Sequence, residues 1–161
     1  MQENTEDNPF RQYAFALYGR QGVAEKLLHL QDQYGLNINM LLLMAWLGRC
    51  RQRVDSAFID DCLVRIGALD TKLIQPLREV RRNIYRLLGN NKHYHHAKAL
   101  ELALETVILD ELYQQAITTP PGSIGEFCMA DNVHDYCRSQ TDMHEKALLQ
   151  ALDFYQQDSF V

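Results

Sequence analysis

Four arginines between residues 78 and 86 are the strongest candidates for ligand chemistry in this chain. Arg78, Arg82 and Arg86 recur every four residues with Arg81 alongside, so a helix would carry them together on one side. A guanidinium group is planar and can bind a phosphate or a carboxylate through two parallel hydrogen bonds. We therefore expect a basic helix face that either binds an acidic partner or is neutralised by the chain's own carboxylates.

A histidine-rich segment follows at the start of the next expected helix. His93 and His96 are three residues apart and so share a helix face. The positive end of the helix dipole disfavours their protonation, and neutral imidazoles suit metal binding or base catalysis. Asp131 and His134, also three apart, are candidates to complete a metal site. The alternative is a polar helix start without a metal, because the H-E-x-x-H pattern is absent.

Two pairs of carboxylates lie on the same expected helix. Glu101 and Glu105 are four residues apart and could form an acid/base pair, but beside Lys98 we interpret them as a solvated edge. Asp110 and Glu111 are adjacent on a helix with two apolar lines, so one of them must turn toward the packed side. We expect that carboxylate to be buried against an arginine of the preceding helix.

Arg20 lies in a glycine-flanked turn, Gly19-Arg-Gln-Gly22. The start of the helix that follows could hold an anion with the help of this arginine. Two glycines between neighbouring helices are also ordinary turn chemistry, and this is the alternative interpretation.

Composition predicts a soluble protein of the cytoplasm that forms one domain over all 161 residues, with residues 1–8 as a disordered tail. We find no apolar stretch approaching the roughly 20 residues needed for a membrane span, and no secretory signal. Four cysteines without a C-x-x-C pair predict reduced, buried thiols: Cys50, Cys62, Cys128 and Cys137. No motif implies a cofactor.

Charge is unevenly distributed along the chain. Residues 49–98 hold eleven Lys and Arg against five Asp and Glu, although the whole chain has a net charge of −5. The basic middle can pair with the acidic ends or face an acidic partner. An acidic protein with little aromatic interleaving among its basic residues is unlike a nucleic-acid binder, so we do not expect that partner.

Apolar residues recur at helical spacing nearly everywhere, which predicts an all-α fold. Leu73, Leu77, Val80, Ile84 and Leu87 form a four-three-four-three stripe that we expect to face the core, with a kink at Pro76. The expected helices are Pro9 to Gly19 with Gly19 left-handed, Gly22 to Gly35, a helix capped by Asn37 or Asn39, Asp55 to Gly67, Asp70 to Leu87, His93 to Ile117, a short helix after the Ser123-x-x-Glu126 capping box, and a final helix capped by Thr141.

Met40 to Leu47 is a run of eight residues without a polar side chain, and it includes the single tryptophan, Trp46. A helix that is apolar all round must be surrounded, and the His93–Ile117 helix also carries apolar residues on two sides. These features predict a single-domain orthogonal bundle of seven or eight helices around the Met40–Leu47 helix. If the run is exposed, it becomes the interface of a homodimer.

Several segments together resemble a known family: Leu17-Tyr-Gly-Arg-Gln-Gly-Val-Ala24, Leu30-Gln-Asp-Gln-Tyr-Gly-Leu36, the apolar run through Trp46-Leu-Gly48, and Pro76-Leu-Arg-x-x-Arg-Arg82. The chain is similar to a group of short proteobacterial proteins, described as conserved hypothetical proteins with a domain of unknown function. The resemblance covers most of the chain. It implies no activity, and no catalytic or binding residue is carried over from it.

Two hypotheses about function follow from these residues. The first is a non-catalytic protein that binds a macromolecular partner through the Arg78–Arg86 face or the apolar residues beside it. The alternative is a small-ligand or metal-dependent enzyme with its site near the start of the His93–Ile117 helix.

Overall fold

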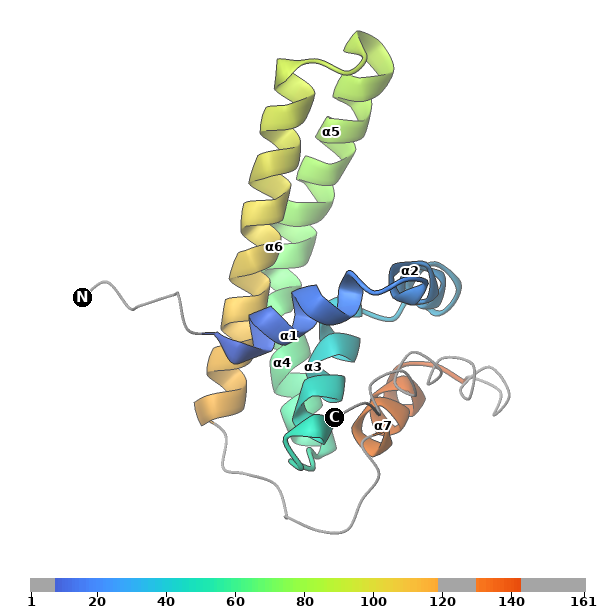
Figure 1. Cartoon of the computed structure of the whole chain (residues 1–161), viewed down its shortest axis with the longest axis vertical. Helices are drawn as coiled ribbons and strands as arrows, with labels where there is room; N and C mark the ends of the chain where they lie inside the picture. Colours follow the sequence, from blue (N-terminus) through green and yellow to red (C-terminus); the bar gives the residue numbers. More distant parts are fainter. Residues whose placement is uncertain (1–7, 119–129, 143–161) are drawn as a thin grey trace, which may run out of the picture.

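The computed structural model describes residues 8–118 and 130–142, and the regular structure in these ranges is entirely helical (Figure 1). This confirms the all-α prediction for the described residues; the expected number of separate helices is not confirmed. The expected helices after Ser123 and after Thr141, and residues 1–7, lie outside these ranges. The elements are α1 (Pro9–Tyr18), α2 (Val23–Tyr34), α3 (Ile38–Arg49), α4 (Ser56–Leu69), the π-helical turn η1 (Asp70–Ile74), α5 (Gln75–Leu88), α6 (Lys92–Thr118) and α7 (Asp131–Gln140). Among them, we find no helix with the length and apolar character that crossing a membrane requires.

Helix α3 carries the apolar run, and the chain itself covers it. Every residue from Met40 to Ala45 is buried, and Leu47 is also buried. Trp46 is half-buried, with its ring 5.5 Å from that of Phe10 and 5.8 Å from that of Tyr113. Helices α1, α2, α6 and α7 all pack against α3. The run is therefore not an open interface for a second copy.

The start of α1 is fixed by Asn8, as the Asn8-Pro9 pair predicts. The Asn8 side-chain oxygen accepts a hydrogen bond from the backbone N–H of Arg11 at 2.9 Å, and Asn8 is buried. The expected tail of residues 1–8 is therefore wrong at Asn8. The prediction for the other end of α1 is also wrong, because Gly19 has a φ of −75° and is not left-handed.

The turn between α2 and α3 agrees with the sequence. Gly35 is left-handed with a φ of +67° and ends α2, and the following Leu36 is fully buried. Of the two candidate caps of α3, the structure uses Asn37, whose side-chain oxygen accepts from the backbone N–H groups of Asn39 and Met40. The backbone N–H of Asn37 also donates to the Tyr136 hydroxyl at 3.0 Å, which joins α7 to this turn.

Helix α4, η1 and α5 follow one another without a break, so the predicted helix end near Gly67 is wrong. The N–H of Gln75 donates to the carbonyl of Asp70, five residues back, as in a π-helix. Pro76 comes directly after this hydrogen bond and has no N–H of its own to donate. The structure shows a widened helical turn just before Pro76, and the kink expected at this residue stays a prediction.

Helices α5 and α6 pack against each other as an antiparallel hairpin that extends well beyond α1, α2 and α3 (Figure 1). We find no buried residue in α5, so the prediction that its apolar stripe faces the core is wrong. The N-terminal half of α6 is also open, because Leu100 and Leu102 are 53% and 57% exposed. Packing on two faces, as we expected for α6, is therefore wrong for this half.

We expect Leu43→Ala in α3 to lower the free energy of unfolding by about 2–5 kcal/mol, because it leaves a cavity in a fully buried site. Val64→Ala in α4 is the control, since Val64 is 80% exposed and its truncation should change stability by no more than about 0.5 kcal/mol. Urea unfolding followed by circular dichroism measures both. Equal losses would contradict the burial described for α3.

Candidate functional site

An ion network around one buried carboxylate joins the two helices of the hairpin. Arg78 on α5 donates a hydrogen bond from Nε to Glu101 and another from Nη2 to Glu105, and each is 2.9 Å long. Arg81 also pairs with Glu101, and the side chain of Glu101 is only 10% exposed. The prediction that Glu101 lies on a solvated edge is therefore wrong. On the predicted basic face, Arg78 and Arg81 are neutralised by the chain's own carboxylates.

The electrostatics of this network keep Glu101 charged. Burial alone would raise the pKa of Glu101, but hydrogen bonds and charge from Arg81 and Arg78 outweigh it and lower the pKa below its usual value. A carboxyl group with a lowered pKa is ionised at neutral pH and is a poor general acid. The network is thus suited to holding two helices in register rather than to proton transfer.

Aromatic rings extend the contact between the helices toward the tip of the hairpin. The Arg81 guanidinium lies over the Tyr94 ring at 5.9 Å, and the rings of Tyr85 and Tyr94 are 5.3 Å apart. The contact between the two helices is therefore partly polar and aromatic. Two aliphatic residues of α5, Leu77 and Ile84, are half-buried beside these groups.

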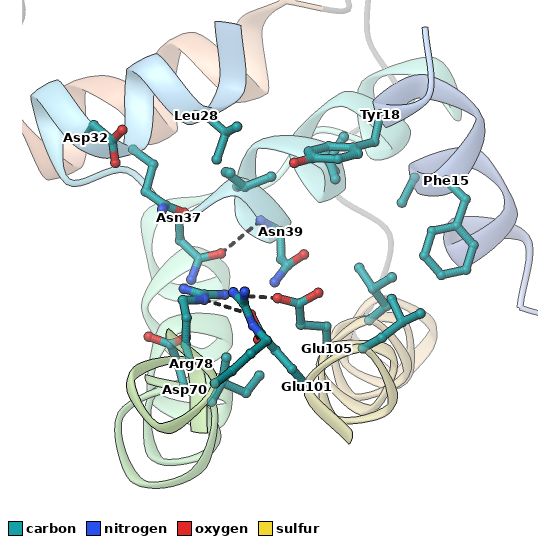
Figure 2. A pocket seen from close by; sticks show the side chains of 18 of the residues that line it. Phe15, Tyr18, Leu28, Asp32, Asn37, Asn39, Asp70, Arg78, Glu101 and Glu105 are labelled. Carbon is teal, nitrogen blue, oxygen red and sulfur yellow. Dashed lines mark hydrogen bonds and ion pairs between the residues drawn. The ribbon is translucent and has the colours of Figure 1, made fainter. Parts of the chain in front are cut away.

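A hollow of about 560 Å³ lies where the hairpin meets α1, α2 and α3. Figure 2 shows Arg78, Glu101 and Glu105 on one side of it, with Phe15 and Tyr18 of α1 on another. Further lining residues are Leu28, Asp32, Asn39, Asp70, Arg82, Leu102 and Leu109. Its walls thus combine paired charges with apolar side chains.

Asp110 and Glu111 are paired, but not with the arginines that we expected. Asp110 accepts hydrogen bonds from Arg11 of α1 at 3.1 Å and from Asn8 at 2.8 Å. Glu111 pairs with Arg65 of α4 at 2.6 Å. The prediction of a partner on the preceding helix is wrong: Arg78 and Arg81 of α5 pair with Glu101 and Glu105, and Asp110 and Glu111 lie further along α6, where Arg11 of α1 and Arg65 of α4 reach them.

The four candidate metal ligands are not brought together. His93 and His96 are exposed at the tip of the hairpin. Asp131 and His134 lie on α7, which packs against α3 and α4 far from that tip (Figure 1). Asp131 forms an ion pair with Arg53 at 3.0 Å. Within residues 8–118 and 130–142, we find no group of three His, Cys, Asp or Glu side chains that could hold a metal ion.

The remaining basic candidates are spread over the surface. Arg82 and Arg86 are exposed on α5; Arg82 lines the hollow, and Arg86 donates to Asn83 at 3.0 Å. Arg20 is exposed in the turn between α1 and α2 and lines a different hollow beside Arg49. Arg20 is therefore not part of one basic surface with the arginines of α5.

The cysteines match the prediction only in part. Cys62 and Cys137 are buried free thiols, and burial raises the pKa of each to about 12. Cys50 is exposed, which corrects the expectation of burial for this residue. Cys128 lies outside the described residues.

The hairpin carries an apolar face on the side away from the hollow. Each residue of a helix is turned by about 100° from the one before it. Viewed down the helix axis, the aliphatic stripe of α5 therefore lies about 40–120° to one side of Arg81. An equivalent set of apolar residues on α6 lies at the same angles from Glu101. Because the helices are antiparallel, the two sets lie on the same side of the hairpin. Arg82 and Leu102 lie on the opposite side of the hairpin, and both line the hollow. We call this set the apolar hairpin face: Leu73 of η1, Leu77, Val80, Ile84 and Leu87 of α5, and Ala97, Leu100, Leu104 and Val107 of α6.

The apolar hairpin face has a floor and two ridges. Its floor consists of half-buried residues next to the helix contact: Leu77, Ile84, Ala97 and Leu104. Its ridges are exposed: Leu73 45%, Val80 50%, Leu87 74%, Leu100 53% and Val107 41%. The sequence identifies both apolar stripes, but places them in the core. Their spacing in alternating steps of three and four is also that of a coiled-coil seam.

Comparison with known proteins gives a family without an activity. A family model described as a protein of unknown function (DUF2390) matches residues 10–112, from α1 into the second half of α6. No curated protein and no solved structure matches the chain significantly. The proteobacterial origin implied by the resemblance stays a prediction.

We expect Glu101→Gln to lower the free energy of unfolding at pH 7 by about 2–4 kcal/mol, because Arg78 and Arg81 lose a charged acceptor in a buried site. The matched control is Glu105→Gln, whose side chain is 38% exposed and bonds Arg78 alone, with an expected loss of at most about 1 kcal/mol.

The difference between Glu101→Gln and the unaltered chain should also depend on pH. A lowered pKa in the folded state contributes stability above the usual pKa of a glutamate, about 4.3, and this contribution disappears as the pH falls through the folded pKa. Denaturant unfolding between neutral and acidic pH should therefore show the gap closing in acid. A gap of constant size would contradict the role assigned to the charge of Glu101.

Proposed function

We propose that this chain, which belongs to the DUF2390 family of proteins of unknown function, is an interaction protein whose apolar hairpin face binds an amphipathic helical partner. The observation that carries the proposal is the uncovered apolar face of α5 and α6. Of the two surfaces named in the interaction hypothesis, the proposal takes the apolar one, because Arg78 and Arg81 are paired internally while the apolar residues beside them are open. Buried free thiols at Cys62 and Cys137 support a cytoplasmic location.

The size of the exposed apolar set supports an interface. Single exposed apolar residues are normal on a protein surface, but a contiguous set on two neighbouring helices is typical of an interaction site. The five ridge residues of the apolar hairpin face are 41–74% exposed. Covering each of them would contribute about 1 kcal/mol, which is half of the value for a fully exposed aliphatic side chain.

The spacing of the face supports a helical partner. Side chains at alternating steps of three and four keep one line in register with a neighbouring helix that crosses at about 20°. Leu73 to Leu87 and Ala97 to Val107 both have this spacing. A partner helix seated between the ridges would place its own apolar side chains against the half-buried floor.

Site-specific photo-crosslinking in cells tests the proposal. A photoreactive amino acid at Val80, on the face, should give a discrete adduct that is lost when Leu100→Glu is introduced on the same face. The control is the same amino acid at Arg82, which lies two residues along α5 and on the side of the hollow. No adduct from Val80, or equal adducts from both positions, would contradict the proposal.

The hollow of about 560 Å³ favours a second candidate function, small-ligand binding. It lies beside Glu101 to Leu109 of α6, further along than the site expected near His93. Arg82 at its wall and the rings of Phe15 and Tyr18 would suit a small aromatic carboxylic acid.

An NMR screen with small aromatic carboxylic acids tests ligand binding. Shifts should gather at the hollow and disappear in Leu102→Trp, which fills it, whereas Leu100→Trp on the other side of α6 should retain them. Shifts spread over the surface, or unaffected by Leu102→Trp, would contradict a site in the hollow.

A further inference from the structure

We infer that the partner of the apolar hairpin face is a second copy of this chain, so that two α5–α6 hairpins join about a two-fold axis in a four-helix bundle. This inference rests on the proposed function, since it names the occupant of the same face.

The dimensions of the face call for two helices rather than one. Leu73 to Leu87 is a seam of about two heptads, and Ala97 to Val107 is shorter. The apolar pattern of a coiled coil between single helices usually continues for three or four heptads or more. Two short seams side by side double the width of the contact, and the layer that covers them best is another two-helix layer, as in four-helix bundles. A second copy offers a face of the same length and width.

The chemistry of the face is compatible with itself. A two-fold contact brings the same patch of both copies together, so a charged side chain at its centre would face the same charge on the other copy. The outward side of the hairpin carries no Asp, Glu, Lys or Arg between Leu73 of η1 and Leu87 of α5 or between His93 and Val107 of α6. At its base, Glu111 is paired with Arg65 at 2.6 Å, so this pair adds no net charge. Arg82 and Lys98 fall on the other side.

The described body of the molecule leaves this face accessible. The hollow between the hairpin and α1, α2 and α3 is lined by Arg82 and Leu102, so these three helices meet the hairpin on the opposite side. The tip half of the hairpin also projects beyond them (Figure 1). A second hairpin can therefore approach without displacing a described helix.

Light scattering on the purified full-length chain tests the inference. We expect a mass of twice 18.7 kDa that falls toward one chain on dilution. Leu100→Glu should raise the dissociation constant of the dimer by at least about 100-fold, because two unpaired charges would be buried in the contact. Leu102→Glu is the matched control: Leu102 is 57% exposed against 53% for Leu100, and it lies on the side of the hollow. This variant should retain the dimer.

A measurement on the unaltered chain keeps the inference testable if Leu100→Glu fails to fold. Methyl NMR signals of Leu100 and Val107 should shift on dilution, and those of Leu102 should not. A single-chain mass at every concentration, or loss of the dimer in Leu102→Glu alone, would overturn the inference.

The photo-crosslinking experiment separates this failure from that of the proposed function. A Val80 adduct of a mass other than two chains, together with a monomeric purified chain, would leave the helical-partner proposal standing with another occupant. A monomer that gives no adduct would overturn both. A monomer whose Leu100 and Val107 methyl signals change on removal of residues 143–161 would assign the face to that segment of the chain and overturn both as well.

Discussion

The ion network of Glu101 with Arg78 and Arg81 is the constraint on which the hairpin depends. A buried carboxylate between two guanidinium groups is stable only when all three stay together, since an unpaired charge in that site is costly. Such an ion group fixes how the two helices are aligned more than it raises the free energy of unfolding, because an apolar contact of the same shape would hold the helices at least as well. Here it fixes which side of α5 faces α6.

Because the ion network turns Arg78 and Arg81 toward α6, much of the apolar stripe of α5 faces away from α6. In α5 the side turned toward α6 carries Arg78 and Arg81, with the half-buried Leu77 and Ile84 at its edge. The outer residues of the aliphatic stripe from Leu73 to Leu87 are exposed to solvent. The ion network between the helices and the exposed apolar ridge are therefore two consequences of one packing arrangement. In the rest of the described molecule the apolar residues are inside, as in the buried run of α3.

The sequence predicts local structure well where a single residue determines it. Asn8, Gly35 and Asp55 set helix ends where expected, and each does so through its own backbone or side chain. It fails where distant residues compete. An apolar stripe at helical spacing predicts burial, but not whether the chain or a partner covers it. The pairing of Glu101 rather than Asp110 with the arginines of α5 depends on a hairpin alignment that no local pattern encodes.

Amide hydrogen exchange, measured above and below the association concentration, shows whether the apolar hairpin face is covered in solution. If the apolar hairpin face is covered by a partner helix pair, the added protection at high concentration will be confined to α5 and to residues 92–107 of α6, because local opening of these helices then also requires separation of the copies. Protection that does not change with concentration, or that appears in α3 instead, would contradict the account.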